Sequence, residues 1–172
     1  MNINELLRYD TSVNTTGCCP KFDPAGWDDQ ALHLRDKPFV RAGTRSVMYV
    51  PQDMGEVFAR VFRHIEQAGA SGEDGVLVMS RDLSPTNAEH LFAVSKPVPE
   101  EQMTTLSGDF VTKVFEGPYE RIGQWRDELA QRVRAHHAVP GDVYFFYTTC
   151  PKCAQAYGRN YVVGIAALEP GA

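Results

Sequence analysis

The sequence lacks an apolar run long enough to cross a bilayer, and its first residues do not combine a basic stretch with an apolar one. Lysine and arginine are scattered and the formal net charge is -5, so the basic patch that nucleic-acid binding requires is missing. The chain also contains no nucleophile elbow, no phosphate-binding glycine loop and no His-Glu-x-x-His helix. We therefore expect a cytoplasmic protein that binds neither membranes nor nucleic acids.

Cysteine is scarce, with four residues among 172. Because thiols stay reduced in the cytoplasm, we interpret the four first as metal ligands or reactive thiols rather than disulfides. Cys150 and Cys153 have the two-residue gap of a zinc knuckle, and Cys18 and Cys19 would supply two further thiolates from a distant part of the chain. Such a structural zinc site would pin the N-terminal segment onto the last hairpin.

The cysteines allow other interpretations. Adjacent cysteines seldom both ligate one ion, so three thiolates plus another ligand is one alternative. A reversible disulfide, a low-pKa reactive thiol and buried structural thiols are further ones. A thioredoxin-like redox site is disfavoured, because there the Cys-x-x-Cys sequence opens a helix after the first strands, whereas we expect Cys150 and Cys153 in a hairpin between the last two strands.

The chain has the apolar content of an ordinary globular domain, with 43% hydrophobic residues. Residues 1–30 are expected to be irregular, apart from a short helix over 3–8. Elements expected next are strands over 31–35 and 39–50 separated by a turn at 36–38, and a helix with a capping box of Asp53 and Glu56 that ends at Gly69. A strand over 75–80, a turn at 84–87 and a strand over 89–95 are expected after the helix.

The second half repeats this order of elements. The pattern predicts a strand over 109–115, a break at Gly117 and Pro118, a helix with the apolar stripe Ile122, Trp125, Leu129 and Val133, a turn at Pro140 and Gly141, and strands over 142–149 and 161–168. We therefore predict an α+β fold of tandem duplicated β-α-β-β modules around a central pocket. It would form a single domain over 1–172, with an N-terminal extension (1–30), a first module (31–99) and a second module (100–172).

Several motifs carry a resemblance to known proteins. The stretch from Phe115 to Gly123, followed by an amphipathic helix, resembles the strand-to-helix motif of the GyrI-like small-molecule-binding family, and the duplicated order of elements agrees with it. More narrowly, three segments resemble a bacterial subgroup labelled as hydrolase: Cys18 through Trp27, Thr148 through Cys153, and Tyr157 through Val163.

The resemblance implies a pocket for bulky, planar, often cationic or drug-like molecules, as in multidrug-responsive transcription regulators. Some free-standing relatives hydrolyse reactive cyclopropane-bearing natural products. Many relatives carry a glutamate on the penultimate strand, facing the ligand. Here that strand runs from Asp142 to Tyr147 and contains none.

Aromatic residues gather near the last two predicted strands and suit a flat ligand. The candidate ligand-binding residues are Trp27, Tyr144, Phe146, Tyr157 and Tyr161. The alternative for each is core packing, because side chains alternate between the two faces of a strand.

Glu116 is the candidate general base, since a carboxylate at a strand end beside a cleft would activate water. The alternative is a solvated loop glutamate. Tyr119 or Tyr147 would polarise the leaving group, although Tyr119 could instead hold the start of the helix. Glu89 and His90 form a second candidate acid–base pair.

These observations predict a GyrI-like protein that detoxifies by hydrolysing or sequestering a bulky small molecule of hydrophobic or cationic character. The alternatives are a non-catalytic module for a ligand or protein partner, and a cysteine- or zinc-dependent protein. The protein would be a monomer or a homodimer.

Overall fold

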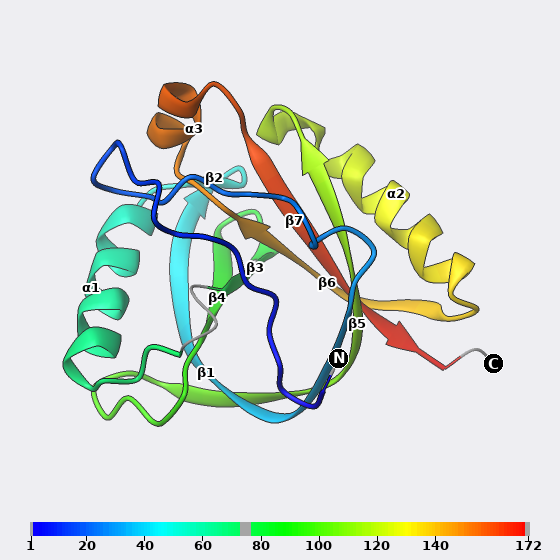
Figure 1. Ribbon diagram of the computed structural model, residues 1–172, viewed down its shortest axis with the longest axis horizontal. Helices are drawn as coiled ribbons and strands as arrows, with labels where there is room; N and C mark the ends of the chain where they lie inside the picture. The colour runs from blue at the N-terminus through cyan, green and yellow to red at the C-terminus, as the bar shows by residue number, and fades with distance from the viewer. Residues whose placement is uncertain (1, 73–76, 171–172) are drawn as a thin grey trace. The chain divides into compact units, whose positions relative to one another are not determined.

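The computed structural model describes residues 2–72 and 77–170, and the chain divides into two compact units. We call Arg35–Ser107 the middle unit, and Met1–Leu34 with Gly108–Ala172 the terminal unit. In chain order the elements are β1 (Ala31–Val47), β2 (Val50–Pro51), α1 (Met54–Gln67), β3 (Val78–Ser84), β4 (Asn87–Ala93), β5 (Met103–Glu116), a 3₁₀ helix (Tyr119–Arg121), α2 (Ile122–Ala135), β6 (Val139–Tyr147), α3 (Pro151–Tyr157) and β7 (Tyr161–Glu169) (Figure 1). The predicted α+β class is confirmed. None of the described helices is both long and apolar enough to span a membrane.

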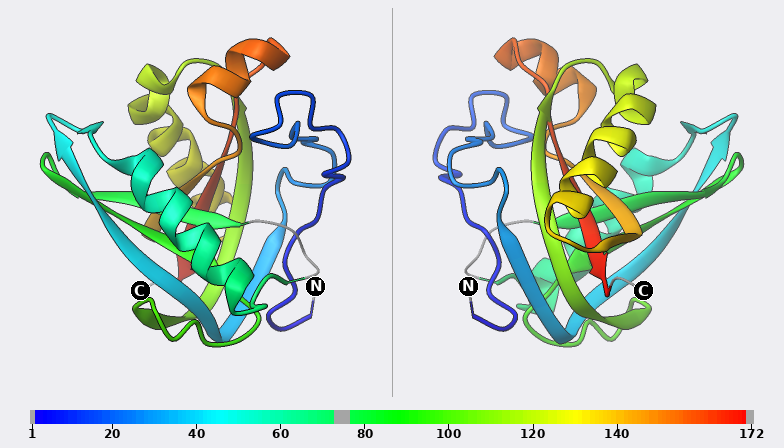
Figure 2. Two further views of the ribbon diagram at one scale, coloured as in Figure 1. Left: turned by 90° about the vertical axis from the view of Figure 1, so that its left-hand side faces the viewer. Right: turned by 90° about the vertical axis from the view of Figure 1, so that its right-hand side faces the viewer.

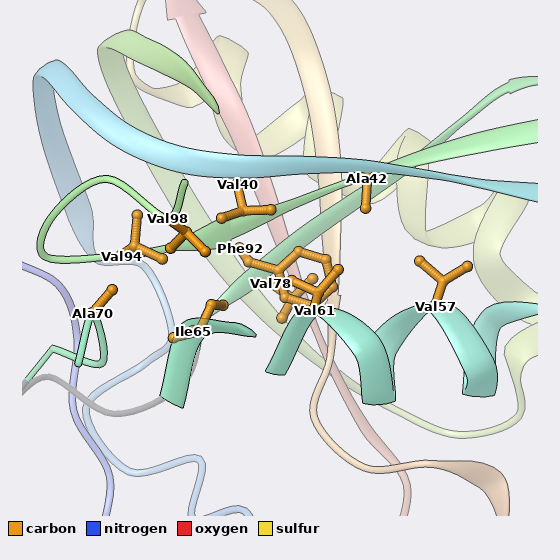
Figure 3. Close-up of a cluster of buried hydrophobic side chains, with 10 residues drawn as sticks. All are labelled: Val40, Ala42, Val57, Val61, Ile65, Ala70, Val78, Phe92, Val94 and Val98. Atoms are coloured by element: carbon orange, nitrogen blue, oxygen red, sulfur yellow. The ribbon is translucent and has the colours of Figure 1, made fainter. Parts of the chain in front are cut away.

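In the middle unit, β4 lies between β1 and β3 and pairs antiparallel with both, while the short β2 pairs with β1. Helix α1 lays its apolar stripe on this sheet: Val57, Val61 and Ile65 are buried against a cluster that includes Val40 and Phe92 (Figure 3). The apolar residues that predicted this helix therefore recur every 3.6 residues because they form its one buried face.

The ends of α1 differ from one another in how well they were predicted. Gly69 follows the helix with φ 62, the left-handed conformation that ends a helix and favours glycine. Asp53 stands at the N-cap but makes no side-chain cap bond, so the capping box is wrong. Its carboxylate instead accepts the backbone N–H of Arg45 at 2.8 Å and the Arg45 Nε at 3.1 Å.

The predicted turn at 36–38 is wrong, because β1 continues through it. Asp36 absorbs the irregularity with φ 48, and its N–H donates to Ser107 Oγ at 2.8 Å. Pro38 has no N–H to offer, but its carbonyl accepts the N–H of Val94 at 3.4 Å, so proline is compatible with a strand here. The turn between β3 and β4 lies where it was predicted. The first two residues of the predicted strand over 75–80, residues 75 and 76, lie outside the described residues.

A strained two-residue turn joins β1 to β2. Met48 and Tyr49 have φ 48 and 68 and stand between the paired residues Val47 and Val50. Two positive φ angles define the hairpin turn that asparagine and glycine normally occupy. Neither methionine nor tyrosine has the side chain that lowers the energy of this conformation.

Replacing Met48 with Asn and Tyr49 with Gly should therefore raise the free energy of unfolding by roughly 1 kcal/mol or more. Urea denaturation of the double variant against the wild type measures this. Met48→Ala is the matched control, because it removes the exposed side chain without relieving the backbone. An unchanged unfolding free energy in the double variant would refute the strain.

In the terminal unit, β5 and β6 both pair antiparallel with β7, which lies between them. Helix α2 connects β5 to β6 and packs on β6 and β7 (Figure 2). Trp125, Leu129 and Val133 of its predicted stripe are buried. Gly164 of β7 allows this approach, since a Cβ there would lie 2.8 Å from Leu129 Cδ2.

Three predictions for the terminal unit are wrong. The helix over 3–8 is absent: Ile3 makes an isolated bridge to His33 within an otherwise irregular segment. Pro140 does not begin a turn but lies at an irregularity inside β6, where the register with β7 shifts. The expected hairpin after β6 contains helix α3, so the Cys-x-x-Cys sequence opens a helix, although this helix lies between the last two strands as expected.

The first half of the chain has the order β1, β2, α1, β3, β4, and the second has β5, α2, β6, α3, β7, so the short β2 and helix α3 interrupt the predicted order of strand, helix, strand, strand. In each unit the helix joins two strands that lie on either side of a third, antiparallel strand. The origin of the two modules by duplication and the GyrI-like fold stay predictions. The N-terminal segment belongs to the same compact unit as most of the second module.

Candidate functional site

The four cysteines come together in the terminal unit although they are distant in sequence. The Sγ atoms of Cys18, Cys19, Cys150 and Cys153 all lie within 4.8 Å of one another. The Sγ atoms of Cys18 and Cys19 are 3.7 Å apart, and all four thiols are free. The predicted meeting of the two pairs is confirmed, and a cluster of this kind could bind a metal ion.

Polar groups of the N-terminal segment surround the thiols. Thr16 Oγ1 accepts the backbone N–H of Cys18 at 3.3 Å and of Cys19 at 3.4 Å, and it lies 3.3 Å from Cys153 Sγ. The Cys150 N–H donates to Cys19 Sγ at 3.5 Å. The hydrogen bond with Thr16 lowers the pKa of Cys153 to about 6, whereas burial raises the pKa of Cys19. The cluster therefore favours a thiolate at Cys153 at neutral pH.

Three of the predicted ligand-binding aromatics lie in the core. Trp27, Tyr144 and Phe146 are each 2–3% exposed. The Trp27 ring lies 5.7 Å from Phe146 and 5.2 Å from Phe22, and its Nε1 donates to the Arg8 carbonyl at 3.1 Å. None of the three is among the residues that line the two hollows described below.

Tyr157 and Tyr161, the other two predicted aromatics, line a small hollow of about 10 Å³ together with Lys21, Phe22, Thr148, Thr149 and Arg159. This volume holds a single water at most. The Tyr157 hydroxyl donates to the Cys19 carbonyl at 2.6 Å. Tyr157 therefore joins α3 to the N-terminal segment beside the cysteines.

Glu116 lies at the end of β5 with half of its side chain exposed. Its Oε1 is 3.4 Å from Arg159 Nη1, and the same nitrogen donates to the Tyr161 hydroxyl at 3.0 Å. The carboxylate is thus paired with a guanidinium at the surface rather than surrounded by apolar groups. Its role as a general base stays a prediction.

The two predicted catalytic tyrosines lie next to one another. The rings of Tyr119 and Tyr147 are 5.7 Å apart in an edge-to-face arrangement. The Tyr119 hydroxyl donates to the Thr149 carbonyl at 3.1 Å, and burial raises its pKa to about 12. Tyr119 therefore joins the start of α2 to the segment before α3 and stays protonated at neutral pH.

A larger hollow lies beside the cysteines, and we call it the α3 depression. Its volume is about 370 Å³, and it is lined by Pro118, Tyr119, Glu120, Pro151, Ala154, Gln155, Gly158, Arg159 and Asn160. The depression is open to solvent and combines one acid, one guanidinium and two amides with apolar proline and alanine. Asn160 Nδ2 donates to the Gly117 carbonyl at 2.7 Å, while its buried Oδ1 has no hydrogen-bond partner.

Glu89 and His90 do not form the predicted acid–base pair, because neighbouring residues of a strand point to opposite faces. The Glu89 carboxylate accepts Arg41 Nε at 2.7 Å and Arg81 Nε at 2.6 Å. His90 is buried, with Nε2 2.8 Å from Thr44 Oγ1 and Nδ1 2.7 Å from Ser80 Oγ.

Burial lowers the pKa of His90 to about 4. Between the unfolded pKa, about 6.5, and about 4, the unfolded chain binds a proton that the folded chain excludes. The stability of the middle unit is therefore full above this window and should fall by up to about 3 kcal/mol as the pH drops through it. Urea denaturation at pH 7 and pH 4.5 measures this, and His90→Gln should flatten the dependence.

His137→Asn is the control, because His137 has φ 58, which asparagine tolerates, and its side chain is exposed. This variant should keep the pH dependence of the wild type. A His90→Gln variant that loses as much stability as the wild type between the two pH values would contradict the assignment.

A family model described as Bacterial hydrolase matches residues 9–168. The chain belongs to this bacterial hydrolase family. The match covers both cysteine pairs and the residues of the α3 depression. No curated protein matches the chain. The predicted resemblance to a bacterial subgroup labelled as hydrolase is thus confirmed at the level of the family. The GyrI-like relationship stays a prediction.

Arg159 is a residue of this region that the sequence analysis did not select. Arg159 lines both hollows and contacts Glu116 and Tyr161. The sequence analysis selected its neighbours Tyr157 and Tyr161 as ligand-binding aromatics, but it did not select the arginine between them. Gly158, at φ 75, ends α3 just before it and was the available signal that a helix end lies there.

Proposed function

We propose that the protein is a hydrolase that binds a bulky small molecule in the α3 depression. The observation that carries this proposal is the position of the Arg159 guanidinium on the wall of a hollow that also presents the Glu120 carboxylate, in a member of the bacterial hydrolase family. A volume of about 370 Å³ lies within the range of small-molecule sites.

Arg159 supplies the positive charge that a hydrolytic transition state requires. A guanidinium at the wall can hold a substrate carbonyl or carboxylate oxygen and stabilise negative charge that develops on it. Because Arg159 lies at the surface, where it contacts Glu116 and Tyr161, it can turn toward a substrate at little cost to packing.

Two carboxylates are close enough to serve the attacking water. Glu120 lines the depression, and Glu116 lies 3.4 Å from Arg159. A base must lie within hydrogen-bond reach of the water that it deprotonates, and these two carboxylates are the candidates for a substrate held by Arg159. Tyr119 would form a wall and position the start of α2, while Pro151 and Ala154 would contact the apolar part of the substrate.

The wall of the depression supports a proposal for the class of substrate. Proline, alanine and the Tyr119 ring suit a bulky or planar drug-like compound, and a hydrolysable carbonyl would face Arg159. Sequestration of such a compound without hydrolysis is the alternative function.

A thermal-shift screen against planar compounds that carry ester, lactone or amide groups tests the proposal, with mass spectrometry on every hit. A ligand of the native state raises the melting temperature. A shift with hydrolysed product supports the hydrolase. A shift with intact compound after prolonged incubation would leave a binding protein and overturn the catalytic step.

Arg159→Gln should lower kcat/KM for a hit compound about 100-fold or more, the usual loss when a charge-stabilising donor is removed. Glu116→Gln and Glu120→Gln identify the base, because the variant that lacks it should lose about 100-fold or more in kcat. Arg63→Gln is the matched control, since Arg63 is an exposed arginine of α1 in the middle unit. Full turnover in Arg159→Gln would remove Arg159 from the mechanism.

A further inference from the structure

We infer that Cys18, Cys19, Cys150 and Cys153 form a four-thiolate binding site for a structural zinc ion. The inference does not depend on the proposed hydrolase function, because it rests on the cysteine cluster alone.

The spacing of the sulfur atoms fits a tetrahedral metal–thiolate site. With zinc–sulfur bonds of about 2.3 Å, the corners of a tetrahedron lie about 3.8 Å apart. The Sγ atoms of Cys18 and Cys19 are 3.7 Å apart, and no pair of the four exceeds 4.8 Å. A contraction of at most about 1 Å, within the freedom of cysteine rotamers, therefore closes the site around an ion.

Disulfide pairing fits the same atoms less well. Adjacent residues have Cα atoms about 3.8 Å apart, which is shorter than the usual Cα separation in a disulfide, so Cys18 and Cys19 are poorly placed to bridge each other. A disulfide between Cys150 and Cys153 would leave Cys18 and Cys19 as free thiols next to that disulfide. Pairing between the two segments, Cys18 and Cys19 with Cys150 and Cys153, would use all four sulfurs in two disulfides. Binding of one ion also uses all four, and it does so with the thiols free of disulfides, as they are in this structure.

The backbone around the sulfurs is arranged as a thiolate site requires. The Cys150 N–H donates to Cys19 Sγ at 3.5 Å. A hydrogen bond of this kind spreads the negative charge that four thiolates bring to one ion. Pro151 occupies the first position of α3 and fixes the turn between Cys150 and Cys153.

The position of the site in the fold indicates a structural role. Four protein ligands complete a tetrahedron and leave no position open for water or substrate, as in structural zinc sites. The site joins an irregular loop to the start of α3 across 131 residues of sequence. An ion there holds the N-terminal segment in place, which secondary structure does not do for residues 14–22.

Metal analysis of the full chain, purified under reducing conditions without chelator, tests the inference. We expect about one zinc per chain, and four thiols per chain in denaturant with chelator. Replacing Cys150 and Cys153 with Ser should reduce the zinc content at least tenfold. Lys152→Ala is the matched control, because Lys152 lies between two ligands without donating a sulfur, and it should keep the metal.

A second measurement uses the wild-type protein, so that the inference can be tested even where the serine variant does not fold. Wild-type protein stripped of metal and titrated with Co²⁺ should show the absorption of tetrahedral thiolate coordination and saturate at one ion per chain. Hydrogen exchange should then be faster in residues 14–22 of the stripped protein and unchanged in α1. Fewer than four thiols, iron in place of zinc, or metal-free protein that does not bind Co²⁺ would each overturn the inference.

Discussion

The candidate site depends on the attachment of one irregular segment, residues 2–30, to the sheet and helices of the terminal unit. This segment forms no helix and only an isolated bridge, so its backbone gains little from its own hydrogen bonds. At its end, Thr112 of β5 bonds the segment through both backbone and side chain: its N–H donates to the Gln30 carbonyl at 2.9 Å and its hydroxyl to the Trp27 carbonyl. Further along, Trp27 and Phe22 pack on Phe146. The loop around Cys18 and Cys19 is held by Tyr157 and the other two cysteines.

Conformational entropy explains why these attachments are strong side-chain contacts. Ordering the backbone costs about 1–2 kcal/mol for each residue, and a strand or helix recovers this cost through regular bonds and packing. An irregular segment must recover it through a few large contacts, which accounts for the two buried aromatic rings of Phe22 and Trp27. The loop at 14–20 contains no such ring. Its four-sulfur contact is therefore the part of the segment where cross-linking by a metal adds most to the order of the chain.

The parts of the fold that follow a period were predictable, and those set by single residues or distant contacts were not. Helices α1 and α2 each span 14 residues, long enough to show an apolar stripe. Helix α3 has seven, too few for a stripe, and only Pro151 and Gly158 marked its ends. On β6 both faces are buried, with Tyr144, Phe145 and Phe146 in succession, so alternation could not separate core from pocket. The cysteine cluster was predictable because the chain has only four cysteines and they stand in two close pairs, a pattern typical of a shared metal site. The pairing of Arg159 with Glu116 was not predictable, because it depends on the register of β5 and β7.

Helix α3 connects the two chemical features of the terminal unit. Cys150 and Cys153 lie at its start, one turn apart, and contribute to the sulfur cluster. Pro151, Ala154 and Gln155 of the same helix form a wall of the depression, and Arg159 follows its end. A helix of seven residues is too short to be stable by itself, so its position is set by the contacts on its sides. If an ion fixes the cysteine side, the wall of the depression is fixed with it, and a substrate that binds this wall must favour the metal-bound form to the same extent. Stability and substrate binding in this protein are then two consequences of one contact, the attachment of α3 to the N-terminal segment.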